Sequence, residues 1–271
     1  MQQWRAQLYE LEEHQLDFTV WRYLTFPKFI HLISSGSLWF QRLQFLNDNL
    51  EGSLPKATET AMTASYQKSK KVFNTPELQK QIDEMASRNV SDGRSLTAVN
   101  CWFIGDDESE RMWNEYVGSS EGVAVRSTAK SLRDSVFLYP EFSFIGRVKY
   151  VDYATHDMGI YEGHQAYRRA FLKDSAQFSH ENELRLSTMN TKTPACVDSL
   201  GQSFPESELK GAGMNNFDEA GLNVRVDLER LFNTVVSAPG APSWFHDLLI
   251  QISLKSGFSW NVERSSFHPK D

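Results

Sequence analysis

Two acidic side chains separated by one residue, Glu181 and Glu183, are the part of the sequence best suited to chemistry. If residues 178–187 form a strand, the alternation of side chains places Glu181, Glu183 and Arg185 on one face. Paired carboxylates on a rigid strand suit a reaction at a sugar carbon, where one stabilises positive charge and the other handles a proton or a nucleophile. The alternative is a solvent-exposed face on which Arg185 neutralises Glu183 while the leucines face the core.

Two further polar positions stand out in segments that are otherwise apolar. Arg22 lies within residues 17–24, which have apolar side chains on both faces and are expected to form a central strand. An arginine there must be paired or face a cleft, and its planar guanidinium suits a ligand pyrophosphate. A buried ion pair with Asp or Glu is the alternative. Ser127 and Thr128 end another expected strand, where capping of the next helix explains them without a ligand.

The elements that must position these residues form an α+β pattern, because strands and helices mix without regular alternation. We expect a mixed or antiparallel central sheet with flanking helices, within a single domain over residues 1–271. Strands are expected at 17–24, 37–42, 96–103, 123–126, 146–153, 183–188, 222–226, 233–238 and 258–262. Helices are expected at 27–35, 106–117, 129–136, 165–178 and 242–256. Residues 190–216 are rich in Gly, Ser, Pro and Asn and are expected to form a long loop.

Residues 54–89 are expected to form two polar helices, broken near Asn74-Thr-Pro76. Their composition leaves little apolar surface to bury, so we interpret them as a helical insertion that acts as a mobile lid. Their lysines would suit a polyanionic acceptor such as RNA or DNA, and the ordinary alternative is a solvated helix face.

Composition restricts the class of protein. The chain has 271 residues, of which 40% are hydrophobic, and its 28 Lys and Arg against 35 Asp and Glu give a net charge of −7. This balance disfavours wholesale wrapping of nucleic acid. Two cysteines far apart and seven histidines without a ligand spacing indicate neither a disulfide framework nor a metal site. We find no signal-peptide pattern and no membrane-spanning stretch, so we expect a cytoplasmic protein without a membrane partner.

A set of short motifs is distributed over most of the chain: Trp21-Arg-Tyr23, Ser35-Gly-Ser-Leu-Trp-Phe40, Asn47-Asp48 with Glu51-Gly52, Cys101-Trp102, Met112-Trp113 with Tyr116, Gly122-Val-Ala-Val125, and Glu181-Asn-Glu-Leu-Arg185. With these motifs the chain resembles the bacterial family named domain of unknown function 2971. That resemblance implies no established activity.

The order of Arg22, Ser127-Thr128 and Glu181-x-Glu183 is similar to that in the arginine class of ADP-ribosyltransferases. The strand, helix, Ser-Gly and strand of residues 20–40 resemble the opening of that fold. This more distant resemblance implies an ADP-ribosyltransferase-like core with NAD as substrate. It assigns Arg22 to the NAD phosphates, Ser127 to positioning the catalytic carboxylate, Glu183 to catalysis and Glu181 to orienting the acceptor. The middle motif departs from the class, because it reads Ser127-Thr-Ala129 instead of Ser-Thr-Ser.

The same resemblance implies that an aromatic side chain stacks on nicotinamide, with Tyr23 and Trp113 as candidates beside Trp39 and Trp102. It implies an acceptor that is a protein or a nucleic acid, a role as a bacterial toxin or phage-defence effector, and a cognate antitoxin or regulator as partner. Two other classes stay open. One is a non-catalytic interaction or sensor module, and the other is a Mg²⁺-dependent nuclease using Asp48, Glu51, Glu181 and Glu183.

Overall fold

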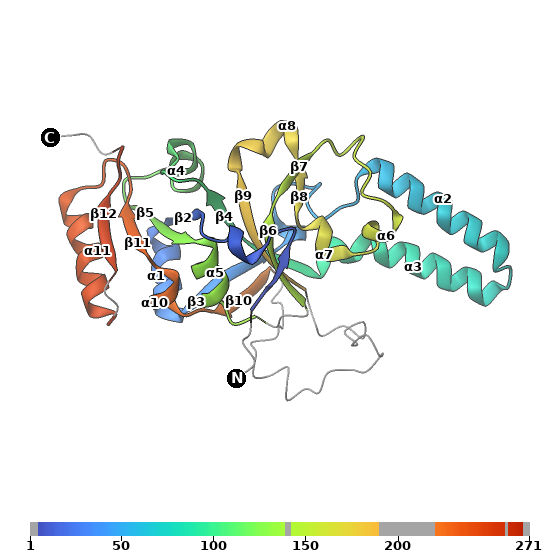
Figure 1. Ribbon diagram of the computed structural model, residues 1–271, viewed down its shortest axis with the longest axis horizontal. Helices are drawn as coiled ribbons and strands as arrows, with labels where there is room; N and C mark the ends of the chain where they lie inside the picture. Colours follow the sequence, from blue (N-terminus) through green and yellow to red (C-terminus); the bar gives the residue numbers. More distant parts are fainter. Residues whose placement is uncertain (1–4, 139–141, 190–219, 258–259, 268–271) are drawn as a thin grey trace, which may run out of the picture.

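The protein is described here from a computed structural model, which defines residues 5–138, 142–189, 220–257 and 260–267. Over these residues the chain has the α+β class that the sequence predicts, with a mixed central sheet and flanking helices (Figure 1). The expected loop at 190–216 lies outside the described residues. Among the described helices, none combines the length and the apolar character needed to cross a lipid bilayer.

The strands are β1 (Gln7–Tyr9), β2 (Thr19–Thr25), β3 (Ser37–Arg42), β4 (Thr97–Ile104), β5 (Gly122–Thr128), β6 (Ser143–Arg147), β7 (Lys149–Val151), β8 (Leu172–Asp174), β9 (Glu183–Met189), β10 (Gly221–Arg225), β11 (Thr234–Ser237) and β12 (Asn261–Arg264). The helices are α1 (Phe26–Ser35), α2 (Lys56–Val72), α3 (Pro76–Ser95), α4 (Glu110–Tyr116), α5 (Ala129–Ser135), α6 (Ile160–Gly163), α7 (Ala166–Arg169), α8 (Ser175–Phe178), α10 (Leu228–Leu231) and α11 (Ser243–Lys255). Short 3-10 turns occupy Glu13–Gln15, Leu43–Phe45 and Ser179–Glu181.

The main sheet has the strand order β1-β6-β9-β4-β2-β5-β11-β12, with β3 pairing β4 and β10 pairing β3. Its pairs are antiparallel except β1 with β6 and β11 with β12. Strands β7 and β8 form a separate parallel pair. The sheet is therefore mixed and mostly antiparallel, as expected from short strands joined by irregular connections.

The edge of β4 opposite β9 is shared by two strands, and this creates a fork in the sheet. Strand β2 pairs with Phe103 and Ile104, whereas β3 pairs with Ala98 and Val99. Residues 100–102 between them have no ladder partner on that edge within the described chain. Helix α1 connects β2 to β3, and it ends at Gly36, whose φ of 59° is the left-handed conformation that favours glycine at a helix end. The functional residues considered below gather at this fork.

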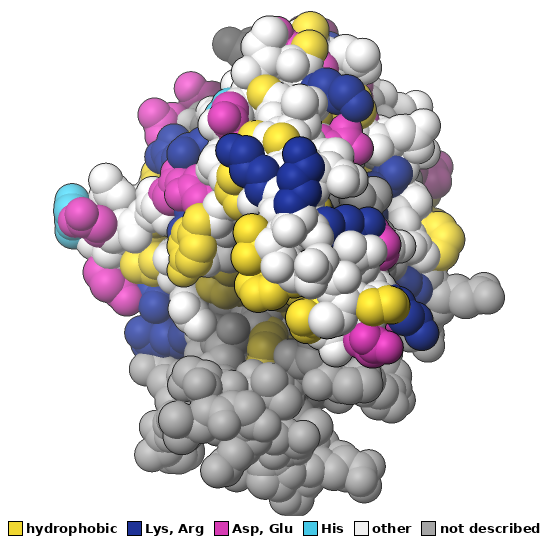
Figure 2. Space-filling view, turned by 90° about the vertical axis from the view of Figure 1, so that its right-hand side faces the viewer, with side chains coloured by type: hydrophobic (Ala, Val, Ile, Leu, Met, Phe, Trp, Pro, Cys, Tyr) yellow, Lys and Arg dark blue, Asp and Glu magenta, His cyan; other side chains and the backbone are white. Residues whose placement is uncertain are grey.

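Helices α2 and α3 form a long hairpin that projects from the sheet (Figure 1), and Figure 2 views the molecule from the end that carries it. Pro76 begins α3, where a proline needs no intrahelical partner for its nitrogen. The buried Arg169 holds the base of the hairpin by donating to the carbonyl oxygens of Asn89, at 2.6 Å, and Gly163, at 2.5 Å. The two predicted helices are thus confirmed, and α3 extends further than expected.

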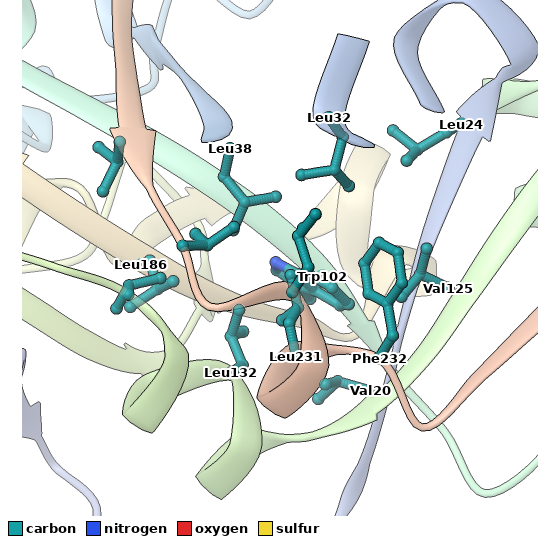
Figure 3. Packing of buried hydrophobic residues seen from close by; sticks show 14 of the residues in the cluster. Val20, Leu24, Leu32, Leu38, Trp102, Val125, Leu132, Leu186, Leu231 and Phe232 are labelled. Atoms are coloured by element: carbon teal, nitrogen blue, oxygen red, sulfur yellow. The ribbon is translucent and has the colours of Figure 1, made fainter. Parts of the chain in front are cut away.

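The main hydrophobic core lies where α1, α5, α10 and α11 pack against the sheet. Trp102 of β4 is surrounded there by leucines from three of these helices: Leu32, Leu132 and Leu231 (Figure 3). Its indole nitrogen donates to the side-chain oxygen of Asn100 at 2.7 Å, which satisfies its buried polar group. This core fixes β4, the strand at the centre of the fork.

Three expectations about elements need correction. Residues 165–178 form α7, β8 and α8 instead of one helix, because β8 pairs with β7, and such pairing is non-local. The segment expected as one strand at 146–153 belongs to β6 and β7, which are separated at Val148. The last strand is β12 at Asn261–Arg264, shifted from the expected 258–262.

Candidate functional site

A cavity of about 600 Å³ opens at the fork between β2, β3 and β4. One wall is aromatic and includes Trp21, Tyr23, Trp39, Trp102, Phe103 and Tyr116. The other wall is charged and includes Arg22, Glu51, Lys173, Glu181, Glu183 and Arg185. Ligand cavities commonly have this combination of an apolar lining, a few convergent polar groups and a volume of roughly 300–1,000 Å³.

Lys173 is the centre of the charged wall and is almost completely buried. Its ammonium nitrogen lies 3.1 Å from Glu51 Oε1 and 3.7 Å from Glu183 Oε2, and it donates a short hydrogen bond to Glu181 Oε2. It also lies 4.5 Å from the centre of the Phe178 ring, which faces a cation favourably. One ammonium therefore joins three carboxylates from two separate segments, residue 51 and residues 181–183.

The Arg185 guanidinium binds both carboxylate oxygens of Glu183. Its Nε donates to Glu183 Oε1 at 3.0 Å, and its Nη2 donates to Oε2 at 2.7 Å. Its Nη1 donates to the Ala170 carbonyl at 2.7 Å and lies 2.9 Å from Glu51 Oε2. Bidentate pairs of this kind are strong and fix orientation. Burial of these groups excludes the solvent-exposed strand face that was one interpretation of the sequence.

These contacts keep Glu183 and Lys173 ionised although both are buried. Burial alone would raise the pKa of Glu183, but the positive charges of Arg185 and Lys173 hold that pKa below its ordinary value. Burial would lower the pKa of Lys173, but Glu183 and Glu51 raise it above its ordinary value. At neutral pH, Glu183 is therefore an anion and Lys173 a cation.

A turn brings Glu181 and Glu183 to the same cation, Lys173. The alternation of side chains along a strand is not the cause. Glu181 ends a 3-10 turn, Asn182 has a φ of 36°, and β9 begins only at Glu183. Asparagine tolerates this left-handed conformation, and the Asn182 side chain donates to the Ile104 carbonyl at 2.7 Å. The predicted proximity of the two carboxylates is correct, but a strand over the whole of 178–187 is not formed.

Arg22 faces the cavity from β2, at the point where β2 separates from β4. Its Nη1 donates a short hydrogen bond to the carbonyl of Cys101, one of the unpaired positions of β4. Among the described residues, no carboxylate lies within salt-bridge distance of Arg22. Burial lowers the pKa of its guanidinium, although nearby acidic groups including Glu183 oppose that effect. The buried ion pair that was the alternative for Arg22 is thus not formed within the described chain.

Tyr116, at the end of α4, connects the cavity to the surface. It is 47% exposed, yet its hydroxyl donates to Glu181 Oε1 at 3.0 Å. Burial and the nearby Glu181 raise the pKa of this phenol. Tyr116 thus links the buried Glu181 carboxylate to the surface.

A second polar group lies beside Tyr116. His180 Nε2 is 3.1 Å from Glu115 Oε2, and one ligand atom each from Glu115, His180 and Glu181 lie within 4.8 Å of one another. These are ligand types that a divalent metal ion can use. However, Arg111 already pairs with Glu115 and Lys173 with Glu181, so much of the negative charge is neutralised by the protein.

The structure brings together most, but not all, of the predicted site residues. Arg22, Tyr23, Glu181 and Glu183 all line the cavity. Ser127 does not, because its hydroxyl donates to the Leu231 carbonyl at 2.6 Å in the core. The adjacent residue caps α5 instead: Thr128 Oγ1 accepts from the Ser131 amide at 3.0 Å, as expected for helix capping.

Trp113 also lies outside the cavity. It packs edge-on against Tyr23, with ring centres 5.0 Å apart, and its indole nitrogen donates to Glu108 Oε2 at 2.8 Å. The Tyr23 hydroxyl accepts from the Ser109 amide at 2.8 Å. Of the aromatic residues expected to stack on nicotinamide, Tyr23, Trp39 and Trp102 contribute to the cavity wall. Only Trp39 among these three is not fully buried.

The residue that sequence reasoning missed is Lys173. It was placed inside an expected helix at 165–178, where a lysine would be an ordinary surface residue. Glu51, a metal ligand in the nuclease alternative, instead pairs with Lys173 and Arg185. Of the four proposed nuclease ligands, Glu51, Glu181 and Glu183 share the charged wall, whereas Asp48 does not line it. In that wall the protein's own cations occupy the position that Mg²⁺ would need.

No family model, curated protein or solved structure matches the chain significantly. The resemblances to family 2971 and to the ADP-ribosyltransferases therefore stay expectations. What the site can do chemically follows from its geometry: it offers the partly buried guanidinium of Arg22, which has no carboxylate partner among the described residues, two adjacent carboxylates kept in place by cations, and flat aromatic surfaces.

Proposed function

We propose that the cavity binds NAD and that the chain is an ADP-ribosyltransferase-like enzyme. The observation that carries the proposal is Arg22, a partly buried cation that faces the cavity without a carboxylate partner in the described chain. Removing a charge from water without a counter-charge is unfavourable, and a planar guanidinium binds phosphate oxygens well. A pyrophosphate would supply the missing negative charge.

The two carboxylates then lie beside the sugar at which the reaction occurs. Glu183 still has acceptor capacity, because a carboxylate has about four lone-pair sites and Arg185 uses two. It would accept a hydrogen bond from the ribose 2′-hydroxyl and stabilise the positive charge that grows as the bond from C1′ to the nicotinamide nitrogen breaks. The electron pair of that bond leaves with nicotinamide.

Glu181 would act on the acceptor. Its position beneath the half-exposed Tyr116 lets a nucleophile on a protein or nucleic acid approach it from outside. Glu181 would orient that nucleophile and accept its proton as the new bond to C1′ forms. Trp39, the least buried of the three candidate aromatic side chains, would provide the flat surface for the nicotinamide ring. A toxin or defence effector that modifies a macromolecule would use this arrangement.

The test is transfer of label from adenine-labelled NAD in the presence of cell lysate, together with release of nicotinamide. We expect label to enter protein or nucleic acid without added metal, and we expect Glu183→Gln to reduce nicotinamide release by about 10²–10³-fold. Glu51→Gln is the matched control, because Glu51 pairs with the same Lys173 and Arg185 but has no proposed catalytic role.

Three results would contradict the proposal. Equal loss of turnover in the Glu51 and Glu183 variants would show that only the integrity of the cluster matters. Activity that needs Mg²⁺ and disappears with a chelator would favour the nuclease. Binding of NAD without nicotinamide release or label transfer would favour a sensor module.

A further inference from the structure

The tip of the α2–α3 hairpin exposes hydrophobic side chains. Val72 is 73% exposed, Phe73 is 51% exposed, and Leu78 in the first turn of α3 is also exposed. We call these three residues the tip patch. Large hydrophobic side chains grouped on a protrusion indicate a contact surface more strongly than scattered ones.

Lysines surround the tip patch. Residues 68–80 contain Lys68, Lys70, Lys71 and Lys80 against one acidic residue, Glu77, in a chain whose net charge is −7. Lys70 is used within the hairpin, where it pairs with Asp83, and Lys80 lies 3.9 Å from Glu84. Lys68 and Lys71 are exposed, and neither has a carboxylate partner among the described residues. Figure 2 shows Lys and Arg side chains gathered near the centre of the face that carries the hairpin, with hydrophobic side chains beside them.

The order of these groups along the hairpin selects the kind of partner. Val72 is the last residue of α2 and Phe73 caps it, so both are at the tip. Lys71 adjoins Val72, and Lys68 lies one helical turn, about 6 Å, behind it. Lys80 is set back by about the same distance on α3. A nucleic acid surface would require the cations outermost, to meet phosphates. A lipid surface requires the reverse order, because apolar groups enter the boundary of the acyl chains to a depth of about 5–10 Å while lysines stay at the headgroups.

In place of the expectation that the protein has no membrane partner, we propose that the hairpin tip docks on an anionic lipid bilayer as a peripheral contact. The tip patch enters the interface, and Lys68, Lys71 and Lys80 contact acidic headgroups. Docking leaves the cavity free, because no hairpin residue lines it. The inference is independent of the chemistry proposed for the cavity, since it needs neither NAD nor an acceptor.

The test is sedimentation of the full chain with phosphatidylcholine vesicles, with and without phosphatidylserine. We expect binding to the phosphatidylserine vesicles only, and loss of that binding in concentrated salt, where charge attraction is screened. The pair Val72→Ser and Phe73→Ser should weaken binding at least tenfold, because both side chains lose apolar burial. The pair Lys68→Gln and Lys71→Gln should weaken it about fivefold per lysine.

The matched control changes two hydrophobic residues on α11, at the other end of the molecule. Trp244 is 56% exposed and Leu254 is 74% exposed, close to the values for Phe73 and Val72. The pair Trp244→Ser and Leu254→Ser should bind vesicles as the unchanged protein does. All of these positions are on the surface, so their melting temperatures should stay close to that of the unchanged protein.

The proposal is wrong if the unchanged protein does not sediment with phosphatidylserine vesicles, or if it binds neutral vesicles equally well. It is also wrong if the α11 pair weakens binding as much as the tip pair. Binding to a single-stranded oligonucleotide that needs Lys68 and Lys71 but tolerates loss of Val72 and Phe73 would identify a nucleic acid partner instead.

Discussion

Replacing Lys173 with methionine removes the cation that three buried carboxylates share. Glu51 and Glu183 would keep Arg185, but Glu181 would keep only the Tyr116 hydroxyl. Methionine has nearly the length of lysine without its charge, so the loss of packing is small. The variant therefore measures the electrostatic role of Lys173.

The expected loss of stability is about 3–5 kcal/mol, the usual cost of removing one partner of a buried ion pair. Lys70→Met is the matched control, because Lys70 also pairs with a carboxylate, that of Asp83, but Asp83 is 63% exposed. An exposed pair of this kind contributes about 0–1 kcal/mol. The difference between the two variants should thus exceed about 2 kcal/mol.

Urea unfolding at pH 7.5 provides the comparison, provided that both variants unfold in one transition with unchanged slope. The double variant Lys173→Met with Glu181→Gln should recover part of the loss, because it removes the carboxylate left without a cation. Lowering the pH should also narrow the difference between Lys173→Met and the unchanged protein. An unpaired buried carboxylate has a raised pKa, and protonation relieves it.

If Lys173→Met costs no more than Lys70→Met, the charged wall does not behave as one buried network. If the Glu181→Gln change adds its full cost to that of Lys173→Met, the two residues are not coupled. Either result would refute the account of the cluster.

Two other predictions concern pH and motion. Because the folded-state pKa of Glu183 is depressed, its contribution to stability is fully present above its ordinary value of about 4.3 and is lost as the pH falls through the folded pKa. Because the pKa of Lys173 is raised, its contribution is complete below about 10.4 and is lost only at more alkaline pH. The urea concentration at the midpoint of unfolding should thus vary little between about pH 4.3 and about pH 10.4. It should decrease at more acidic and at more alkaline pH. In hydrogen exchange, α2 and the first half of α3 should exchange faster than β4 and β9, because few of their side chains are buried. Since no hairpin residue lines the cavity, NAD should protect β2 and β4 and not the hairpin, whereas protection of the hairpin by NAD would support the lid interpretation.

Local signals were enough to predict the opening of the fold. Proline near the start of α1 and glycine at its end mark the helix, and the apolar side chains on both faces of β2 predict a central strand. The hairpin was predictable for the same reason, because Asn74-Thr-Pro76 interrupts two polar helical segments. The segment around Lys173 was not predictable in this way, because β8 has only three residues and is defined by its pairing with β7.

In the site too, features with a local sequence signal were predictable, whereas contacts between distant segments were not. The spacing of Glu181 and Glu183 indicated that the two carboxylates lie together, but the cation between them comes from another segment. The sequence alone did not identify the partner of Arg22. The fork leaves the Cys101 carbonyl without a partner among the described strands on that edge of β4, and Arg22 donates to this carbonyl. For Ser127 a signal was available: alternation puts it on the same face as Val123 and Val125, and that face is the core.

The most direct test of the central claim is the affinity for NAD, measured by titration calorimetry without metal. We expect the unchanged protein to bind and Arg22→Lys to weaken binding by about tenfold or more, because an ammonium cannot replace a bidentate fork on phosphate. Arg133→Lys is the control, since Arg133 is a buried arginine that pairs with Glu13 away from the cavity, and it should bind NAD normally. Failure of the unchanged protein to bind NAD, or equal affinity in the Arg22 variant, would contradict the account.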